Sequence, residues 1–361
     1  MPGGRWRSPF VGAALAVVVL PSAAARAGEA SEVCRRFAEV EAVGTVADPA
    51  LEEISGIATS RRHEGVLWAQ EDSGNDVALH ALSQQGERLG TYSIDGAEAV
   101  DWEDLAVGPG TDPAQPAIYV GDIGDNGADR STTTIYRVAE PDALPSAAGG
   151  TLPLLDRTEV TYPDGPVDAE SLLVDPDSGD VVIITKALLG PSQVLRVPAG
   201  ALGAEAAVGA EVVGELEVPL DLALGEGLPG TAVTSADVAP DGSFVLVRTY
   251  QALLAYPRSA DQSVAEALAG EACSAPVAQE TQGEAVAVTS LGDAYLTIGE
   301  QAGAAVNRVA VAPAPAPVDG AEAGGDGDSS DLLPVVVGVV VAAALILVAV
   351  VLVRRWSRPP G

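Results

Sequence analysis

The chain has 361 residues, of which 51 are acidic and 19 are Lys or Arg, giving a formal net charge of −32. Nucleic acid is a poor partner for so acidic a protein, because phosphate backbones attract Lys and Arg. Lys186 is the only lysine, and the abundance of Ala, Gly and Val is typical of a GC-rich bacterial genome.

Residues 1–27 have the layout of a secretory signal peptide. Arg5 and Arg7 precede an apolar run at 10–20, and the small residues Ala25 and Ala27 follow. We therefore expect the mature chain to begin near residue 28 and to be extracellular. Residues 28–310 then form the globular part, and roughly 280 residues suffice for one large all-β domain.

The chain contains two cysteines, Cys34 and Cys273. The oxidising exterior favours a disulfide over two free thiols, and two lone cysteines are a poor metal site. We expect them to pair.

A short phrase, acidic or small polar at its start and apolar after it, recurs five times in the chain, at 53–58, 101–106, 168–173, 235–239 and 283–287. A second apolar run follows each phrase, at 66–69, 117–120, 181–185, 244–247 and 294–298. A third run follows at 78–82, 134–138, 193–197, 252–256 and 305–309. Some units have a fourth, at 88–94, 158–162 and 212–218. Gly, Pro, Asp and Ser bound these short runs, which is typical of strands.

Recurrence of the strands in one order favours a β-propeller of five four-stranded blades over a sandwich or a barrel. The last unit lacks a fourth strand of its own, and we expect residues 37–46 to supply it. This pairing would close the ring without an open edge. The long intervals at 141–155 and 220–233 leave a degenerate sixth blade as an alternative.

The C-terminal part predicts a membrane anchor. Residues 311–331, first Ala and Pro and then Gly, Asp and Ser, are expected to form a stalk. Residues 332–353 are apolar and uncharged, long enough to cross a bilayer as one helix, although a buried core helix is the alternative. Residues 354–361 carry Arg354, Arg355 and Arg358 and would remain cytoplasmic, so the protein would be a single-pass protein of the cell membrane.

Charged residues should gather at one mouth of the propeller channel. In a meander, the start of the first strand lies on the same face as the end of the second. The expected ligand-binding ring consists of Glu71, Asp101, Glu103, Asp122, Glu170, Lys186, Arg248, Glu284 and Glu300. Such a ring could bind a cation, a polar ligand or a side chain of a partner, while charges that are simply solvated in loops are the alternative.

Two positions of this ring are basic. Lys186 and Arg248 are expected at matching positions of consecutive blades, where they could orient a phosphate or a carboxylate. Neutralising Glu170 and Asp237 is the other interpretation.

Two related loops, at 71–76 and 122–127, are rich in carboxylate and amide oxygens. The candidate metal ligands are Asp72, Asp122, Asp125 and Asn126, which would suit Ca²⁺. Asx turns explain the same residues without a metal. The sequence has no nucleophile elbow, zinc motif or phosphate-cradling glycine loop.

Residues 54–58 (ISGIA), 67–74 (LWAQEDSG), 101–106 (DWEDLA) and 119–126 (YVGDIGDN) resemble those of exported, membrane-anchored propeller proteins of actinobacteria. That family is similar in turn to phytase-like and NHL-type propellers. The resemblance covers about a quarter of the chain and implies a propeller fold. Similarity to phytases would imply Ca²⁺-assisted phosphoester cleavage with Lys and Arg holding phosphate, yet basic residues are scarce here.

Two functional hypotheses follow from these observations. The first is a membrane-tethered extracellular module that binds a partner protein or an envelope ligand through the charged mouth. The alternative is a Ca²⁺-dependent hydrolase of phosphoesters or lactones, in which Glu103, Glu170 or Asp122 would hold the metal and one carboxylate would act as general base.

Overall fold

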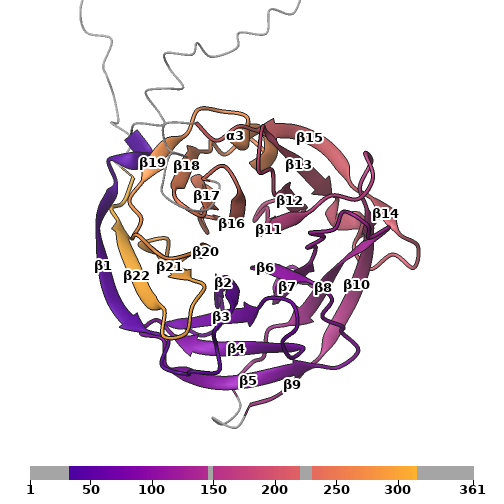
Figure 1. Cartoon of the computed structure of the whole chain (residues 1–361), viewed down its shortest axis with the longest axis horizontal. Helices are drawn as coiled ribbons and strands as arrows, with labels where there is room; N and C mark the ends of the chain where they lie inside the picture. The colour runs from indigo at the N-terminus through magenta and orange to yellow at the C-terminus, as the bar shows by residue number, and fades with distance from the viewer. Residues whose placement is uncertain (1–31, 145–148, 220–229, 315–361) are drawn as a thin grey trace, which may run out of the picture. The chain divides into compact units, whose positions relative to one another are not determined.

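Each repeat of the sequence folds as one antiparallel sheet, and five such sheets surround a common axis (Figure 1). The computed structural model describes residues 32–144, 149–219 and 230–314. The chain divides into two units, Met1–Ala314 and Pro315–Gly361, and all described residues lie in the first. The expected five-bladed β-propeller is confirmed, and the described residues form no sixth blade.

The first two blades are five-stranded. Blade 1 contains β2 (Ile54–Thr59), β3 (Val66–Glu71), β4 (Ala78–Ser83), β5 (Arg88–Ile94) and β9 (Gly150–Leu152). Blade 2 contains β6 (Trp102–Pro109), β7 (Pro116–Asp122), β8 (Thr133–Ala139), β10 (Leu154–Thr161) and β14 (Val208–Gly209). In both blades the fifth strand is parallel to its neighbour. Strand β9 lies within the long interval at 141–155, so this interval extends blade 1 and contributes no extra blade.

The other three blades are four-stranded. Blade 3 contains β11 (Ala169–Val174), β12 (Val181–Thr185), β13 (Ser192–Val197) and β15 (Glu211–Leu216). Blade 4 contains β16 (Val233–Val238), β17 (Phe244–Thr249), β18 (Leu253–Pro257) and β19 (Cys273–Ala275). Blade 5 contains β20 (Gly283–Val288), β21 (Ala294–Gly299), β22 (Ala305–Val311) and β1 (Phe37–Thr45). A 3₁₀ turn at Ala199–Ala201 follows β13, and the helix α3 (Val264–Leu268) precedes β19.

The two ends of the folded domain meet in blade 5. Strand β1 pairs antiparallel with β22, from Phe37 opposite Val311 to Thr45 opposite Ala305. Figure 1 shows this pairing where the indigo and yellow strands lie side by side. The innermost strands β2, β6, β11, β16 and β20 each contact the next, and β20 contacts β2. The prediction that the N-terminal segment completes the last blade is therefore correct.

The hydrophobic core lies between adjacent blades. Trp68 of blade 1 and Trp102 of blade 2 are both buried in the core cluster that these blades share. Trp68 packs edge-to-face on Tyr92, with ring centroids 5.5 Å apart. Each of the five core clusters joins residues of two adjacent blades, so the burial that holds the blades together also fixes the geometry of the channel.

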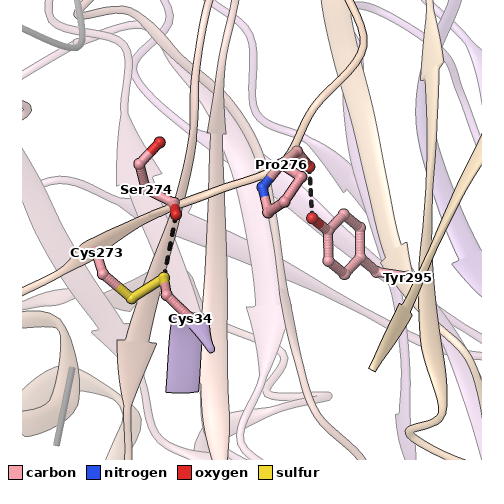
Figure 2. Close-up of a disulfide and its surroundings, with 5 residues drawn as sticks. All are labelled: Cys34, Cys273, Ser274, Pro276 and Tyr295. Atoms are coloured by element: carbon pink, nitrogen blue, oxygen red, sulfur yellow. Dashed lines mark hydrogen bonds between the residues drawn. A yellow bond between two sulfur atoms is a disulfide. The ribbon is translucent and has the colours of Figure 1, made fainter. Parts of the chain in front are cut away.

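The predicted disulfide between Cys34 and Cys273 is present, with the two Cα atoms 6.2 Å apart. It joins the segment before β1 to the outermost strand of blade 4 (Figure 2). Nearby, the Tyr295 hydroxyl of blade 5 donates a hydrogen bond to the carbonyl of Pro276. Both contacts link blade 4 to the blade that β1 completes.

Within the described part of the chain, no helix combines the length and apolar character needed to cross a membrane. The expected span at 332–353 and the expected signal at 1–27 lie outside the described residues. Strand β22 ends at Val311, the first residue of the expected stalk.

Candidate functional site

Every innermost strand begins with the same irregularity in its pairing to the second strand. In blade 2, Trp102 lies opposite Asp122 and Asp104 lies opposite Gly121, so Glu103 has no partner of its own. The extra residues at the five equivalent positions are Ser55, Glu103, Glu170, Thr234 and Glu284. A bulge of this kind re-aims one side chain. Five-fold repetition therefore sets five side chains at one level around the axis.

Two of the five bulge residues are hydroxyl residues that tie adjacent blades together. The Ser55 hydroxyl donates to the carbonyl oxygen of Glu103 at 2.6 Å. The Thr234 hydroxyl makes the equivalent bond to the carbonyl oxygen of Glu284 at 3.1 Å and also contacts that of Gly283 at 2.8 Å. The other three are glutamates, and Glu103, Glu170 and Glu284 are only 3%, 6% and 5% exposed. Three nearly buried carboxyl groups thus converge at the mouth of the channel.

A second set of equivalent residues follows the second strands. In each blade, the inner-strand residue just before the bulge pairs with one residue of the second strand, and the residue of this set comes directly after that partner. These residues are Asp72, Ile123, Lys186, Tyr250 and Glu300. Lys186 and Glu300 therefore stand at equivalent positions, in agreement with the sequence analysis, whereas Arg248 lies two residues before this level. The expected match of Arg248 with Lys186 is wrong, because β17 continues to Thr249, two residues past the end expected at 247.

Arg248 and Asp122 are both buried and each forms an ion pair, although Nε and Nη1 of Arg248 have no hydrogen-bond partner. The guanidinium of Arg248 pairs with Glu280 at 2.5 Å. Asp122 pairs with Arg130 at 2.8 Å and accepts the backbone N–H of Asp101 at 3.0 Å. Asp122 is therefore engaged by Arg130 and the backbone, whereas Arg248 stays within electrostatic reach of Glu284.

The loop after Asp122 is organised by hydrogen bonds of its own. Asp125 accepts the backbone N–H groups of Asp129 and Arg130, each at 3.0 Å, so its carboxylate closes the loop on itself. Asn126 is exposed. Of the four residues predicted as metal ligands, Asp72 alone joins a carboxylate cluster at the mouth.

That cluster consists of Asp72, Asp101 and Glu103. One carboxylate oxygen from each lies within 4.8 Å of the others. Gly124 packs against it so closely that a Cβ at this position would collide with the carboxylate oxygens of Asp101 and Glu103. Blades 1 and 2 thus supply three oxygens suited to a hard cation. The bulge at Glu103 and the glycine at 124 bring them together.

The carboxyl groups of the mouth influence one another across blades. Burial raises the pKa of Glu103 well above its usual range, and the charge of Glu170 raises it further. The pKa of Glu284 is raised well above its usual range by burial and then by the charges of Glu170 and Glu300. Burial and the charge of Asp72 raise the pKa of Glu300. These couplings join blades 1, 2, 3 and 5 in one electrostatic site.

Lys186 is the one lysine that faces these acids. Its Nζ donates to Glu170 Oε1 and lies 5.3 Å from the centre of the Tyr250 ring. The Glu170 ion pair raises the pKa of Lys186, so the lysine stays charged. Burial raises the pKa of Glu170 to about 8 even though the Lys186 charge opposes the shift. Lys186 therefore contacts Glu170, as the second interpretation expected, whereas Arg248 pairs with Glu280 and not with Asp237.

Glu71 lies at the end of β3 with a structural role. Its carboxylate accepts the backbone N–H of Glu52 at 3.0 Å and lies 3.7 Å from Nε2 of His80. Burial lowers the pKa of His80 to about 4, so this histidine is neutral near pH 7. Glu71 therefore supports the loop at 52–53 and contributes little to the opening.

One polar cluster on the axis escaped the sequence analysis. Asp104 is fully buried, and one of its oxygens accepts the backbone N–H of Leu172 at 3.0 Å and that of Ala236 at 3.3 Å. Its other oxygen accepts the N–H of Leu105 at 2.9 Å and the Ser235 hydroxyl at 3.2 Å. The carboxylate therefore bridges the inner strands of blades 2, 3 and 4. The adjacent acids at 103 and 104 in an apolar strand were the available signal, since neighbouring residues of a strand face opposite ways.

Comparison with known proteins adds no assignment, since no family model and no curated protein matches this chain. The functional reading rests on the geometry of the mouth.

Proposed function

We propose that this protein is a membrane-tethered extracellular binding module that uses the carboxylate-lined mouth of its propeller to hold a cationic ligand. The observation that carries the proposal is the convergence of Glu103, Glu170 and Glu284 from three equivalent bulges. Buried carboxyl groups cost free energy unless something compensates them. A buried carboxyl group at the same position of three blades is expected of a binding site. A partner protein or an envelope component outside the cell would be the natural source of the ligand.

A divalent cation, with Ca²⁺ as the first choice, is proposed to bind Asp72, Asp101 and Glu103. Ca²⁺ takes six to eight oxygen ligands, so these three carboxylates would supply part of its shell. The fit is supported by the 4.8 Å limit on the separations of their oxygens and by the close packing of Gly124. Bound there, the ion would neutralise the acids of blades 1 and 2 and leave coordination positions for oxygens of a ligand.

Calorimetric titration of the chelator-stripped protein with Ca²⁺ tests this assignment. We expect a binding heat and a rise in melting temperature on addition of Ca²⁺. Glu103→Gln should lower the affinity for Ca²⁺ at least about tenfold. Glu87→Gln, an exposed charge in the turn between β4 and β5, is the matched control and should bind as the parent does. Absence of any Ca²⁺ effect on the folded parent would refute the metal site.

The second candidate function is a Ca²⁺-dependent hydrolase of phosphoesters or lactones. It is favoured by Glu170, whose pKa of about 8 is that of a group able to exchange a proton near neutral pH, and by the adjacent Lys186. Assays on generic phosphoester and lactone substrates with Ca²⁺ distinguish the two candidates. Turnover that requires the metal and is lost in Glu170→Gln would support the hydrolase, while no turnover by a folded, Ca²⁺-binding protein would support the binding module.

A further inference from the structure

The rim of the mouth carries large exposed apolar side chains. Val100 is 56% exposed, Leu188 is 54% exposed and Leu189 is 93% exposed. These three residues are called the apolar rim. Four more large apolar side chains of the described residues are exposed, and they lie on outer strands or, in the case of Leu291, in the turn between β20 and β21. The apolar rim is thus the part of this exposed set that borders the carboxylates.

The equivalences around the ring place the apolar rim beside the opening. Val100 precedes the bulge residue of blade 2 by three positions, and Thr231 precedes the bulge residue of blade 4 by the same number. The Thr231 hydroxyl donates to the carbonyl oxygen of Leu188 at 3.0 Å. The loop of blade 3 that carries Leu188 and Leu189 therefore contacts the segment just before the inner strand of blade 4.

Blade 5 supplies carboxyl groups that no basic side chain of the described residues pairs with. Gln282 donates its side-chain amide to Glu300, and the charges of Glu170 and Glu300 both act on Glu284. Across the mouth, Lys186 is already held by Glu170 and Tyr250. A guanidinium or an ammonium placed against these neighbouring carboxyl groups would make charge-assisted hydrogen bonds with them.

We propose that the mouth takes a Lys or Arg side chain of a partner protein, inserted against Glu284 and Glu300, while apolar residues flanking that side chain pack on the apolar rim. This inference rests on the proposed function and names the partner of the same site. A metal ion at Asp72, Asp101 and Glu103 would occupy the side of blades 1 and 2, and the partner's cation would occupy the side of blade 5. The apolar rim favours a protein segment over a small polyamine, because only the former brings apolar neighbours on both sides of its charge.

Binding of labelled peptides to the full chain, measured by fluorescence anisotropy, tests the inference. The probes are Gly-Leu-Arg-Leu-Gly, blocked at both ends, the same peptide with citrulline for Arg, and the same peptide with Ala for both Leu. We expect the first to bind and each of the others to bind at least about tenfold more weakly, which corresponds to about 1.4 kcal/mol. Spermidine should compete poorly.

Protein variants separate this inference from the proposed function. The double variant L188S/L189S should weaken the Leu-Arg-Leu peptide at least about tenfold and leave Ca²⁺ binding unchanged, whereas E284Q/E300Q should weaken the Arg peptide more than the citrulline peptide. Leu291→Ser, an equally drastic change at the other end of the strands, is the control and should bind the peptide normally.

Each outcome of these experiments supports or overturns a defined statement. Ca²⁺ binding without peptide binding, or a peptide affinity that L188S/L189S leaves unchanged, would overturn the inference alone. Tight spermidine binding that depends on the glutamates and not on the leucines would replace the protein partner with a soluble polycation. Failure of a folded protein to bind Ca²⁺, spermidine or peptide would overturn the proposed function as well.

Discussion

Removal of the Asp104 carboxylate should destabilise the whole propeller. Asp104 accepts three buried backbone N–H groups, from Leu105, Leu172 and Ala236, in addition to the Ser235 hydroxyl. In Asp104→Ala the three N–H groups lose their acceptor, and each buried donor left unpaired costs about 1–3 kcal/mol. The sum, about 3–9 kcal/mol, is partly offset because a carboxylate no longer has to be buried. We therefore expect a loss of about 3–5 kcal/mol in the free energy of unfolding.

Asp104→Asn separates the hydrogen bonds from the packing. Its amide oxygen can still accept from Leu172 and Ala236, while its NH₂ group would face the N–H of Leu105, so that one donor remains unpaired. The expected cost is about 1–3 kcal/mol, between the parent and Asp104→Ala. Because the Asn side chain has nearly the same volume as Asp, a cavity cannot account for the loss.

Urea unfolding, followed by the fluorescence of Trp68 and Trp102 in the core, measures these free energies. Glu87→Ala, which removes an exposed acid, is the control and should lie within about 0.5 kcal/mol of the parent. If Asp104→Ala costs less than about 1 kcal/mol, or if Asp104→Asn is as stable as the parent, the carboxylate does not hold the inner strands together.

Three further predictions concern the disulfide and the mouth. C34S/C273S should lower the free energy of unfolding by up to about 5 kcal/mol, since the bridge spans a sequence separation of 239, and an unchanged urea midpoint would contradict this. The pKa of Glu170 is raised from 4.5 to about 8, so its stabilising contribution is complete below pH 4.5 and is lost as the pH rises through 8. Glu170→Gln should therefore flatten the fall in stability over this range by up to about 1.4 kcal/mol per pH unit, and an equal slope in both proteins would count against the raised pKa. Gly124→Ala should weaken Ca²⁺ binding at least about tenfold, because its Cβ would displace two carboxylates, and calorimetry showing parental affinity would place the ion elsewhere.

The strands were predictable because their apolar runs are short and recur in phase. The second strand of blade 3, for example, was expected at 181–185 and is found at Val181–Thr185. The pairing of residues 37–46 with the last blade followed from the need to leave no edge open. Short elements carry too little pattern, and β19 (Cys273–Ala275) and α3 (Val264–Leu268) were therefore not anticipated.

The mouth was predictable only in part, because a bulge has no sequence signature of its own. Glu103, Glu170 and Glu284 were expected at the opening, and the couplings among their pKa values join them there. Arg248 and Asp122 were misplaced because β17 and β7 each continue two residues past their apolar runs, so both residues lie within paired strands. A charged residue at the end of a strand can face solvent or pair inside, and the sequence alone leaves both orientations open.

The meeting of the two ends of the domain in blade 5 constrains when the protein can fold. Strand β1 is synthesised first, yet its partner β22 ends at Val311, so the earliest segment must wait for almost the whole domain to follow. During that delay, Glu39 and Glu41 within the waiting strand keep it soluble and discourage pairing with other chains. Assembly is thereby deferred until synthesis has passed the last blade, and a truncated product lacking β22 would remain an open, protease-sensitive arc.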